Sequence, residues 1–450
     1  MDGNCELSGR IVLPQDPDYD RARRDYNRRF SRFPRMIVYC REVQDVVNAI
    51  HWARRHDVPI RVRSGGHSYE AFSLVDDGVI IDVSGLDAMV IDSRRHLATV
   101  GTGWRLLQLY AALCREGLTI PGGDCPAVGI GGFTAGGGFG MLTRLLGMAC
   151  DSLVALEMVN ARGQIIRADE KINADLLWAC RGGGGGNFGV LTSYMFKVYP
   201  LSEVAMFHLF WDWEAAGEVM SAWQNWAPFV DRRLTSTLRI YNRQDGRVFA
   251  EGQFAGPEKE MRRLMQPLLA AVQPVKSSVA TVSMFQAALI NAGYLTPDGQ
   301  WQQRQEWHKF KNSGAYAYRL LPSKELQTVI DYLRDSLGRR NYLEFQALAG
   351  AVNDVRSEAT AYFHRRALFN LQYSARWEDD SQAADSIRWV EDFRTAMLGS
   401  VTGNYVNFPD LSIRNWPKAY YGTNFARLQE IKAAFDPGDV FHFPQSIPLP

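Results

Sequence analysis

Three glycine-rich segments constrain the fold of this chain more than any other feature of its sequence. They are RSGGHSYE (63–70), GGDCPAVGIGGFTAGGGFG (122–140) and RGGGGGNFG (181–189). The second segment is too rich in glycine for core packing and too long for a single turn. A backbone that lies against a flat, extended ligand and donates N–H bonds to it needs this composition. We therefore expect a large cofactor with a pyrophosphate, with ordinary tight-turn loops as the alternative.

The third segment contains the pattern GxGxxG, formed by Gly184, Gly186 and Gly189. A dinucleotide-binding fingerprint of this kind follows a strand and opens a helix. Here an expected helix precedes the pattern, and the β-branched and aromatic run VLTSYMFKV follows it. No GxxxxGK[ST] motif occurs either, so neither a Rossmann site nor a P-loop is predicted.

The charge balance excludes several classes of partner. The 450 residues include 50 Lys and Arg against 49 Asp and Glu, for a formal net charge of +1. This balance provides no basic field for nucleic acid and no polybasic patch for a membrane surface. The N-terminus has no apolar run typical of a signal peptide, and no window approaches a transmembrane length. We expect a cytoplasmic protein whose partner is a small molecule.

The cysteines do not indicate a metal site or a disulfide framework. The six are scattered without CxxC or zinc-ligand spacing, at Cys5, Cys40, Cys114, Cys125, Cys150 and Cys180. Most are expected to be buried thiols, because free cysteine packs as a small apolar residue. Cys125 differs, since it lies inside the longest glycine segment.

Hydrophobic periodicity predicts an α+β chain with two domains. A strand at 34–40, a helix from Val43 to about His56 and a second strand form a β-α-β start before the first glycine segment. Short strands, a hairpin turning at 161–163 and a short helix before the third segment complete a first domain that ends near Pro200. Beyond it, strands alternate with expected helices near 257–271 and 323–338. This pattern predicts a mixed, largely antiparallel sheet with helices on one face.

Five motifs in order resemble the berberine-bridge-enzyme-like flavoprotein oxidases, a branch of the vanillyl-alcohol-oxidase type of FAD fold. They are RSGGHSYE, GGDCPAVGIGGFTAGGGFG, GGGGGNFGV, FHRRALFNLQY and YYGTNFARLQEIKAAFDPGDVFHFPQSI. The resemblance covers nearly the whole chain. It implies a PCMH-type FAD-binding domain over 1–201, a substrate-binding domain over 202–405, and a C-terminal segment over 406–450 that returns to the FAD domain.

The resemblance also implies that FAD is bound covalently at two positions. His67 would attach to the flavin 8α carbon, and Cys125 would attach to C6. An imidazole and a thiolate are side chains suited to such additions. The other cofactor-binding residues implied are Arg63, Ser64, Gly65, Gly66, Ser68, Tyr69, Asp124, Val128, Gly129, Gly132, Gly137, Gly138, Asn187, Gly189, Val190, Tyr421 and Asn424.

In such relatives, a small residue three positions after the cysteine leaves room for O2, whereas a leucine there accompanies poor oxygen reactivity. This chain has Val128, which favours an oxidase that releases H2O2 over a dehydrogenase with another electron acceptor. Phe133 and Phe139 stand where relatives often have histidine and tyrosine. These departures would alter the flavin potential or substrate stacking and leave the reaction class unchanged.

The resemblance places the catalytic base in the C-terminal motif, at Tyr420, with Tyr421 as the alternative. The base must lie near the flavin face, because proton removal accompanies hydride transfer. Gln372 stands where the cyclising plant relatives have a glutamate, so we expect it to orient a hydroxyl in a simple alcohol oxidation. Gln346 would line the substrate pocket. The alternative for these strand residues is an exposed polar sheet face.

The leading function is thus an FAD-dependent oxidase acting on a sugar hemiacetal, a secondary-metabolite alcohol or an aromatic alcohol, with O2 as the second substrate. A dehydrogenase is the alternative within enzymes. A flavin-loaded structural protein with vestigial catalysis is the alternative outside them. The sequence identifies neither the substrate nor the oligomeric state, and it predicts no metal.

Overall fold

The computed structural model describes residues 6–302, 309–336 and 341–450 of the chain. The first sheet has four strands in the order β1–β2–β4–β3. Their bounds are β1 (Arg10–Val12), β2 (Met36–Tyr39), β3 (Ile60–Arg63) and β4 (Val79–Asp82). β2, β4 and β3 are parallel, whereas β1 pairs antiparallel with β2. The predicted β-α-β start is present, with α2 (Val43–Arg55) as its crossover and β4 inserted between its two strands.

The second sheet has five antiparallel strands in the order β5–β6–β10–β8–β9. They are β5 (Met89–Asp92), β6 (Leu97–Gly101), β8 (Leu153–Val159), β9 (Ile165–Asp169) and β10 (Val190–Lys197). β10 directly follows the third glycine segment, as the sequence predicted. The other elements of this part are α1 (Tyr19–Ala22), α3 (Leu106–Arg115), β7 (Leu118–Thr119), α4 (Ile130–Ala135), α5 (Thr143–Leu146), η1 (Ala149–Ser152), α6 (Ala174–Ala179) and β11 (Tyr199–Pro200).

The third sheet has seven strands in the order β15–β12–β14–β13–β17–β18–β16. They are β12 (Glu203–Asp212), β13 (Leu234–Tyr241), β14 (Arg247–Phe254), β15 (Lys276–Ser283), β16 (Phe310–Ala317), β17 (Tyr342–Ala347) and β18 (Phe369–Arg376). Every neighbouring pair is antiparallel, so the expectation of a mixed sheet here was wrong in this detail. The mixed pairing belongs to the first sheet.

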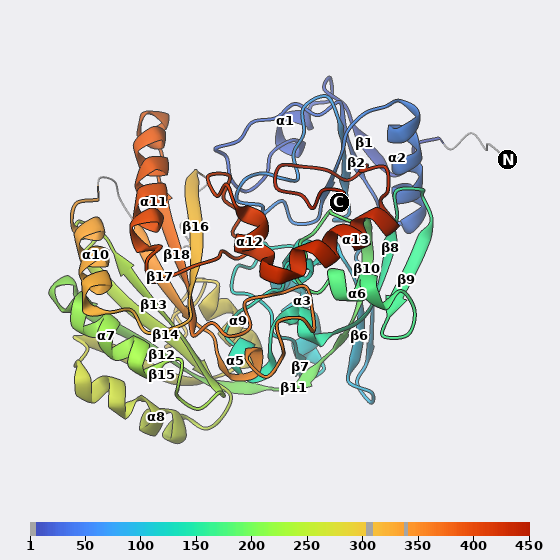
Figure 1. Cartoon of the computed structure of the whole chain (residues 1–450). Helices are drawn as coiled ribbons and strands as arrows, with labels where there is room; N and C mark the ends of the chain where they lie inside the picture. The colour runs from blue at the N-terminus through green and yellow to red at the C-terminus, as the bar shows by residue number, and fades with distance from the viewer. Residues whose placement is uncertain (1–5, 303–308, 337–340) are drawn as a thin grey trace.

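Helices cover one face of the seven-stranded sheet (Figure 1). They are α7 (Ala216–Trp226), α8 (Glu258–Ala271), α10 (Ser323–Arg334) and α11 (Ala383–Met397). α10 ends four residues before the predicted boundary at 338, which lies outside the described residues. Along β18, Leu371 and Tyr373 pack into the core beneath these helices. Asn370, Gln372 and Ser374 alternate with them on the opposite face and are also buried.

The C-terminal segment packs against the first part of the chain. It contains α12 (Trp416–Tyr421), η5 (Gly422–Asn424) and α13 (Phe425–Phe435). The remaining short elements belong to the preceding part of the chain and are η2 (Trp213–Ala215), α9 (Met284–Asn291), η3 (Gly350–Val352) and η4 (Asp380–Gln382). Leu428 and Ile431 of α13 join the core that contains α3, α6 and β10. Figure 1 shows α13 lying across this region beside α6. The last residues of the chain thus complete the core of its first sheets.

The observed helices and sheets confirm the α+β class. No helix within the described ranges combines the length and apolar character needed to cross a membrane.

Candidate active site

A cavity of about 440 Å³ lies between the glycine segments and the seven-stranded sheet. All three glycine segments contribute to it, through residues that include Gly65, Gly129 and Gly186. The opposite wall comes from β13, β16, β17 and β18, through Arg239, Asn312, Tyr342, Glu344, Gln346, Gln372 and Arg376. Segments separated by hundreds of residues therefore meet around one space.

The glycines in this wall are required for two different reasons. Gly65 and Gly129 bring two backbones into direct contact, since a Cβ on Gly65 would overlap the amide nitrogen of Gly129. Gly132 is exposed, and a Cβ there would meet no protein atom within 4 Å. The first pair closes the loops against each other, whereas Gly132 keeps space open beside the cavity. This cradle fits a flat cofactor that approaches the backbone closely.

His67 and Cys125 face each other across the cavity wall. The Nε2 atom of His67 lies 3.8 Å from the Sγ atom of Cys125, and its Nδ1 atom lies 3.0 Å from the carbonyl oxygen of Gly65. Tyr26 stacks on the imidazole with ring centroids 4.2 Å apart. Cys125 belongs to the five described cysteines, all of which are free of disulfides. The two side chains predicted to hold the cofactor thus lie side by side.

Tyr69 and Gln372 both line the cavity and form a polar contact with each other. The Gln372 amide nitrogen donates to the Tyr69 hydroxyl at 3.0 Å. The ring of Phe408 stacks on that of Tyr69 with centroids 5.3 Å apart and an interplanar angle of 18°. Burial raises the pKa of Tyr69, while hydrogen bonds from the Gln372 and Asn312 amides oppose this rise. An amide donor thus points at the phenol oxygen, and no bond from that oxygen to a protein acceptor is found among the described residues.

Most residues predicted for the site line the cavity. These are Ser64, Gly65, Gly66, His67, Ser68, Tyr69, Asp124, Cys125, Val128, Gly129, Gly132, Asn187, Gly189, Gln346, Gln372, Tyr420 and Tyr421. Phe133 and Phe139 lie there as well. The polar face of β17 and β18 therefore faces the cavity, and Glu344 and Gln372 on it are only 5% exposed. The alternative of a solvent-exposed polar sheet face does not describe these strands.

Five predicted cofactor residues lie outside the lining, and hydrogen bonds or packing explain their positions. Arg63 is held by the carboxylates of Asp82 and Asp25. The Asn424 amide donates to backbone carbonyls of 357 and 360. The remaining three are Gly137, Gly138 and Val190, which belong to a buried turn and to β10. They lie outside the residues that line the cavity, and their contact with the cofactor stays a prediction.

The hydroxyl of Tyr420 is occupied by protein partners. It donates to the side-chain oxygen of Gln445 at 2.7 Å and accepts from the backbone N–H of Asp410 at 3.1 Å. Burial raises the pKa of Tyr420. The hydroxyl of Tyr421 donates to the carbonyl of Gly183 at 2.9 Å. Each hydroxyl donates its proton to a protein oxygen, a bond that the deprotonated form needed for a base would lose, so this arrangement disfavours both predicted tyrosines as the base.

The sequence interpretation missed the arginines of the cavity. Arg61, Arg239, Glu344 and Arg376 line it, and Arg239 donates to Glu344 at 2.8 Å. Their alternation with apolar residues along short strands was a usable signal, because such residues share one face of a sheet. Alternation identifies the residues that share one face of the sheet, but it does not show whether a ligand covers that face. Within the described ranges, no three His, Cys, Asp or Glu side chains gather as a possible metal site.

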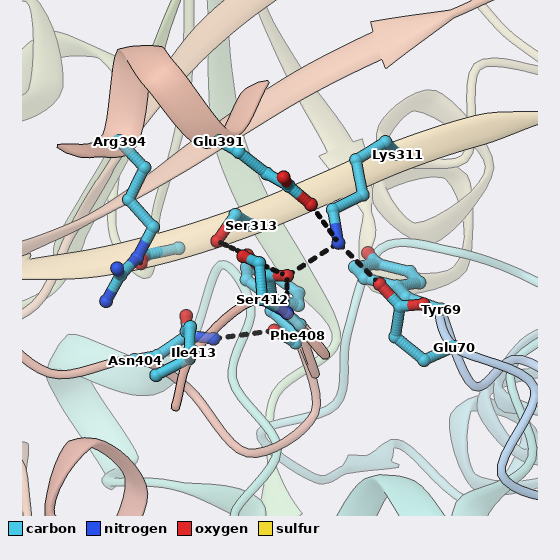
Figure 2. Close-up of polar contacts among 12 residues, drawn as sticks. Tyr69, Glu70, Lys311, Ser313, Glu391, Arg394, Asn404, Phe408, Ser412 and Ile413 are labelled. Carbon is cyan, nitrogen blue, oxygen red and sulfur yellow. Dashed lines mark hydrogen bonds and ion pairs between the residues drawn. The ribbon is translucent and has the colours of Figure 1, made fainter. Parts of the chain in front are cut away.

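A buried ion network fixes the wall next to Tyr69 (Figure 2). The Lys311 ammonium on β16 donates to Glu70 at 2.7 Å and to Asp410 at 2.5 Å, and Glu391 lies 3.6 Å away. The Lys311, Glu70 and Asp410 side chains are at most 3% exposed. Arg29 pairs with the other oxygen of Glu70. The network joins the loop after His67, the seven-stranded sheet and the segment that precedes α12.

Lysine and hydroxyl groups keep one carboxyl of this network ionised. Burial alone would raise the pKa of Asp410, but the Lys311 charge and hydrogen bonds from Ser313 and Ser412 outweigh burial, so its pKa is lowered. The same carboxylates raise the pKa of Lys311 against the opposing effect of burial. Asp410 and Lys311 are therefore both charged near neutral pH, and each stabilises the charged form of the other.

Comparisons with known proteins agree with the geometry of the site. A family model described as FAD binding domain matches residues 34–169, and one described as berberine and berberine like matches 404–448. The FAD-linked oxidoreductase YvdP of Bacillus subtilis (strain 168), itself named uncharacterized, is 42% identical over 448 residues. The match covers 99% of each chain.

Two solved structures resemble the whole chain. BBE-like 1 of Physcomitrella patens matches with a TM-score of 0.92 and 28% identity, covering 99% of this chain and 98% of that one. The grass pollen allergen Phl p 4, described as having glucose dehydrogenase activity, matches with a TM-score of 0.88 and 27% identity, covering 98% and 97%. An isoleucine-to-valine variant of Phl p 4 is described as a glucose oxidase.

Replacing Lys311 with Met is expected to destabilise the protein by about 3–5 kcal/mol near neutral pH, because buried Asp410 loses its ion-pair partner and buried Glu70 keeps only Arg29. The lowered pKa of Asp410 means that this ion pair stabilises the protein above the ordinary carboxyl pKa and is lost as pH falls through the lowered one. The deficit of Lys311→Met should therefore shrink on acidification.

Urea unfolding of both proteins between pH 4 and pH 8 measures the deficit. Lys309→Met, at an exposed ion pair on the same stretch of chain, is the matched control and should cost about 1 kcal/mol or less. A deficit for Lys311→Met that is equally small, or that does not change with pH, would contradict the expected role of the network.

Proposed function

Because the chain belongs to the berberine-bridge-enzyme-like family of FAD-linked oxidoreductases, we propose that it oxidises the CH–OH group of a sugar hemiacetal or another small alcohol. The observation that carries the proposal is a single cavity. In it, His67 and Cys125 lie opposite a buried polar sheet face that contains Tyr69's partner Gln372. One wall suits a flavin, and the other suits a polar substrate held against it.

Two side chains would hold the isoalloxazine ring, and one would face the diphosphate. His67 would be bonded to the flavin 8α carbon and Cys125 to C6, and the 3.8 Å between their Nε2 and Sγ atoms supports attachment to one ring. Arg61 lines the cavity from β3, its Nε atom has no hydrogen-bond partner, and burial lowers its pKa to about 10. A diphosphate would supply the missing partner for this guanidinium. The bound flavin supplies hydride acceptance, and its reoxidation by O2 gives H2O2.

Tyr69 is the proposed proton acceptor, in place of Tyr420. Its hydroxyl faces the cavity, and the Gln372 amide holds it from one side. The aromatic ring of Phe408 fixes the plane of the phenol. Gln372 thereby orients both Tyr69 and a substrate hydroxyl, while Gln346 and Glu344 bond each other at 3.2 Å along the same face.

The size of Val128 supports the oxidase over the dehydrogenase. This residue lines the cavity three positions beyond Cys125, where a branched but short side chain leaves space for O2. In Phl p 4, one isoleucine-to-valine change accompanies the difference between the descriptions glucose dehydrogenase and glucose oxidase. A structural flavoprotein without catalysis would not need the buried polar side chains of β17 and β18 that form the opposite wall.

The division of the chain into domains is part of the proposal. One core unites residues from 98–198 with residues from 413–447 and includes only Ala288 and Ala361 from the range between them, while another lies wholly within 205–401. These cores support a cofactor domain of 1–201 completed by 406–450, and a substrate domain of 202–405.

Acid-precipitated wild-type protein is expected to stay yellow, because two covalent bonds would retain the flavin. His67→Ala and Cys125→Ala should each keep the colour through the remaining bond, and the double variant should release it to the supernatant. Absorbance of pellet and supernatant measures this. Cys114→Ala, at another half-buried thiol, is the control; colour in the wild-type supernatant would contradict bicovalent attachment.

Tyr69→Phe is expected to lower kcat by about 10²–10⁴, the usual contribution of a general base, with flavin content unchanged. Tyr420→Phe should instead cost about 1 kcal/mol of stability by removing its two hydrogen bonds. Because the pKa of Tyr69 is raised, wild-type kcat/KM should still be increasing with pH at the ordinary tyrosine pKa of about 10. Loss of turnover confined to Tyr420→Phe would restore Tyr420 as the base.

Flavin reduced anaerobically by substrate should reoxidise rapidly on mixing with air and release H2O2. Val128→Leu should slow that reoxidation by filling the space for O2, whereas Val128→Ala should not. Stopped-flow absorbance and a peroxide assay measure the two quantities. Rapid reduction of wild-type protein followed by slow reoxidation would favour a dehydrogenase instead.

A further inference from the structure

One guanidinium of the substrate wall has no carboxylate to balance it. Arg376, the last residue of β18, lines the cavity. Its Nη2 donates to the Tyr342 hydroxyl at 3.2 Å, and its guanidinium lies 5.2 Å from the centre of that ring. Among the described residues, no Asp or Glu forms an ion pair with it. Aromatic contact thus holds Arg376 in place and leaves its charge uncompensated.

The acidic groups of the cavity gather elsewhere. Glu344 forms its ion pair with Arg239 at 2.8 Å. Burial raises the pKa of Asp124. The carboxylates of Glu251 and Glu344 raise it further, and Arg239 opposes this rise. The charged and titratable groups that act on Arg376 are tyrosines and Arg239. An arginine that is taken out of bulk water normally finds a hydrogen-bonded anion, because burial of an unpaired charge is costly.

The cofactor does not account for this charge. Arg61, on the opposite wall, is placed to meet the diphosphate. Arg376 shares a sheet face with Gln372, four residues away along one strand, and the two Cα atoms are about 13 Å apart at 3.3 Å per residue. Gln372 orients the reacting hydroxyl in the proposed function. Arg376 would therefore lie beside the part of the substrate that is remote from the oxidised carbon.

We infer that the substrate carries an anionic group, a carboxylate or a phosphate ester, at the end remote from the oxidised carbon, and that Arg376 binds this group. The position of the reacting end rests on the proposed function. The distance suits a sugar of one or two rings with a charged substituent. A planar guanidinium binds either anion through two parallel N–H bonds, and this geometry makes the contact selective.

Sugars that are identical at C1 and differ in charge test the inference on the holoenzyme. D-Glucuronate and D-glucose 6-phosphate should have a KM about tenfold to a hundredfold below that of D-glucose, the worth of a hydrogen bond between charged groups. Arg376→Gln should abolish that ratio. Arg388→Gln, at an exposed arginine of α11, removes the same charge outside the cavity and should preserve it. The two anions separate a carboxylate site from a phosphate site.

A binding measurement gives a second readout that does not require turnover. Methyl β-D-glucuronoside and its C6 amide differ only in charge at C6, the end remote from C1, and their methylated C1 cannot be oxidised to a lactone. Either one bound beside the flavin should shift its visible absorbance. Wild-type protein should bind the glucuronoside at least about tenfold more tightly, and Arg376→Gln should bind both equally. Glucuronoside binding that depends on Arg376 without oxidation of any sugar would contradict the proposed oxidation and support the anion site. Equal affinities in the wild type, or equal losses for both compounds in Arg376→Gln, would overturn it.

Discussion

The buried ammonium of Lys311 is the interaction on which the geometry of the cavity depends. It connects Glu70, three residues after His67, with Asp410, which holds the hydroxyl of Tyr420, and it does so from the sheet that carries Gln372. Burying these ions costs free energy, and only direct hydrogen bonds among all members offset that cost. The network therefore contributes less to overall stability than to the relative placement of three distant segments.

That placement explains why one network can define a site without contributing to its lining. Tyr69 precedes Glu70 directly, so the ion pair with Lys311 restrains the backbone that carries the phenol. Gln372 lies opposite Gly314 on the neighbouring strand β16, three residues beyond Lys311. Movement of either element would stretch both the ion pair and the hydrogen bond between Tyr69 and Gln372. The charged layer behind the wall and the polar contact at its surface thus act as one unit.

Local patterns in the sequence were sufficient for most elements and for the glycine segments that line the cavity, whereas the individual cofactor-binding residues were implied by the family resemblance. Glycine segments, the strand that follows Gly189 and the alternation along 370–374 each depend on a few neighbouring residues. The choice of Tyr420 came from the family resemblance, and only its contacts with Asp410 and Gln445 argue against it. The choice of Tyr69 depends on Gln372, 303 residues away. Strand order is equally non-local, since β13 pairs with β17 across more than a hundred residues. Periodicity alone could identify the polar face, but not the segment that would cover it.

The two walls of the cavity together favour a substrate whose ring has apolar faces and polar edges. Tyr69, Phe139 and Phe408 form an aromatic cluster on one side, with centroid distances of 5.3 and 5.8 Å to Phe408. On the other side, Asn370 donates to Gln346 at 2.7 Å, and the Oδ1 atom of Asn312 is left without a partner. Buried acceptors are normally satisfied, so this oxygen calls for a donor from a ligand. A pyranose offers C–H faces to the rings and hydroxyl donors to the amides, whereas a flat aromatic alcohol offers only one hydroxyl. The same two walls therefore favour the sugar among the proposed substrates, and a charged substituent on it would complete the contacts by reaching Arg376.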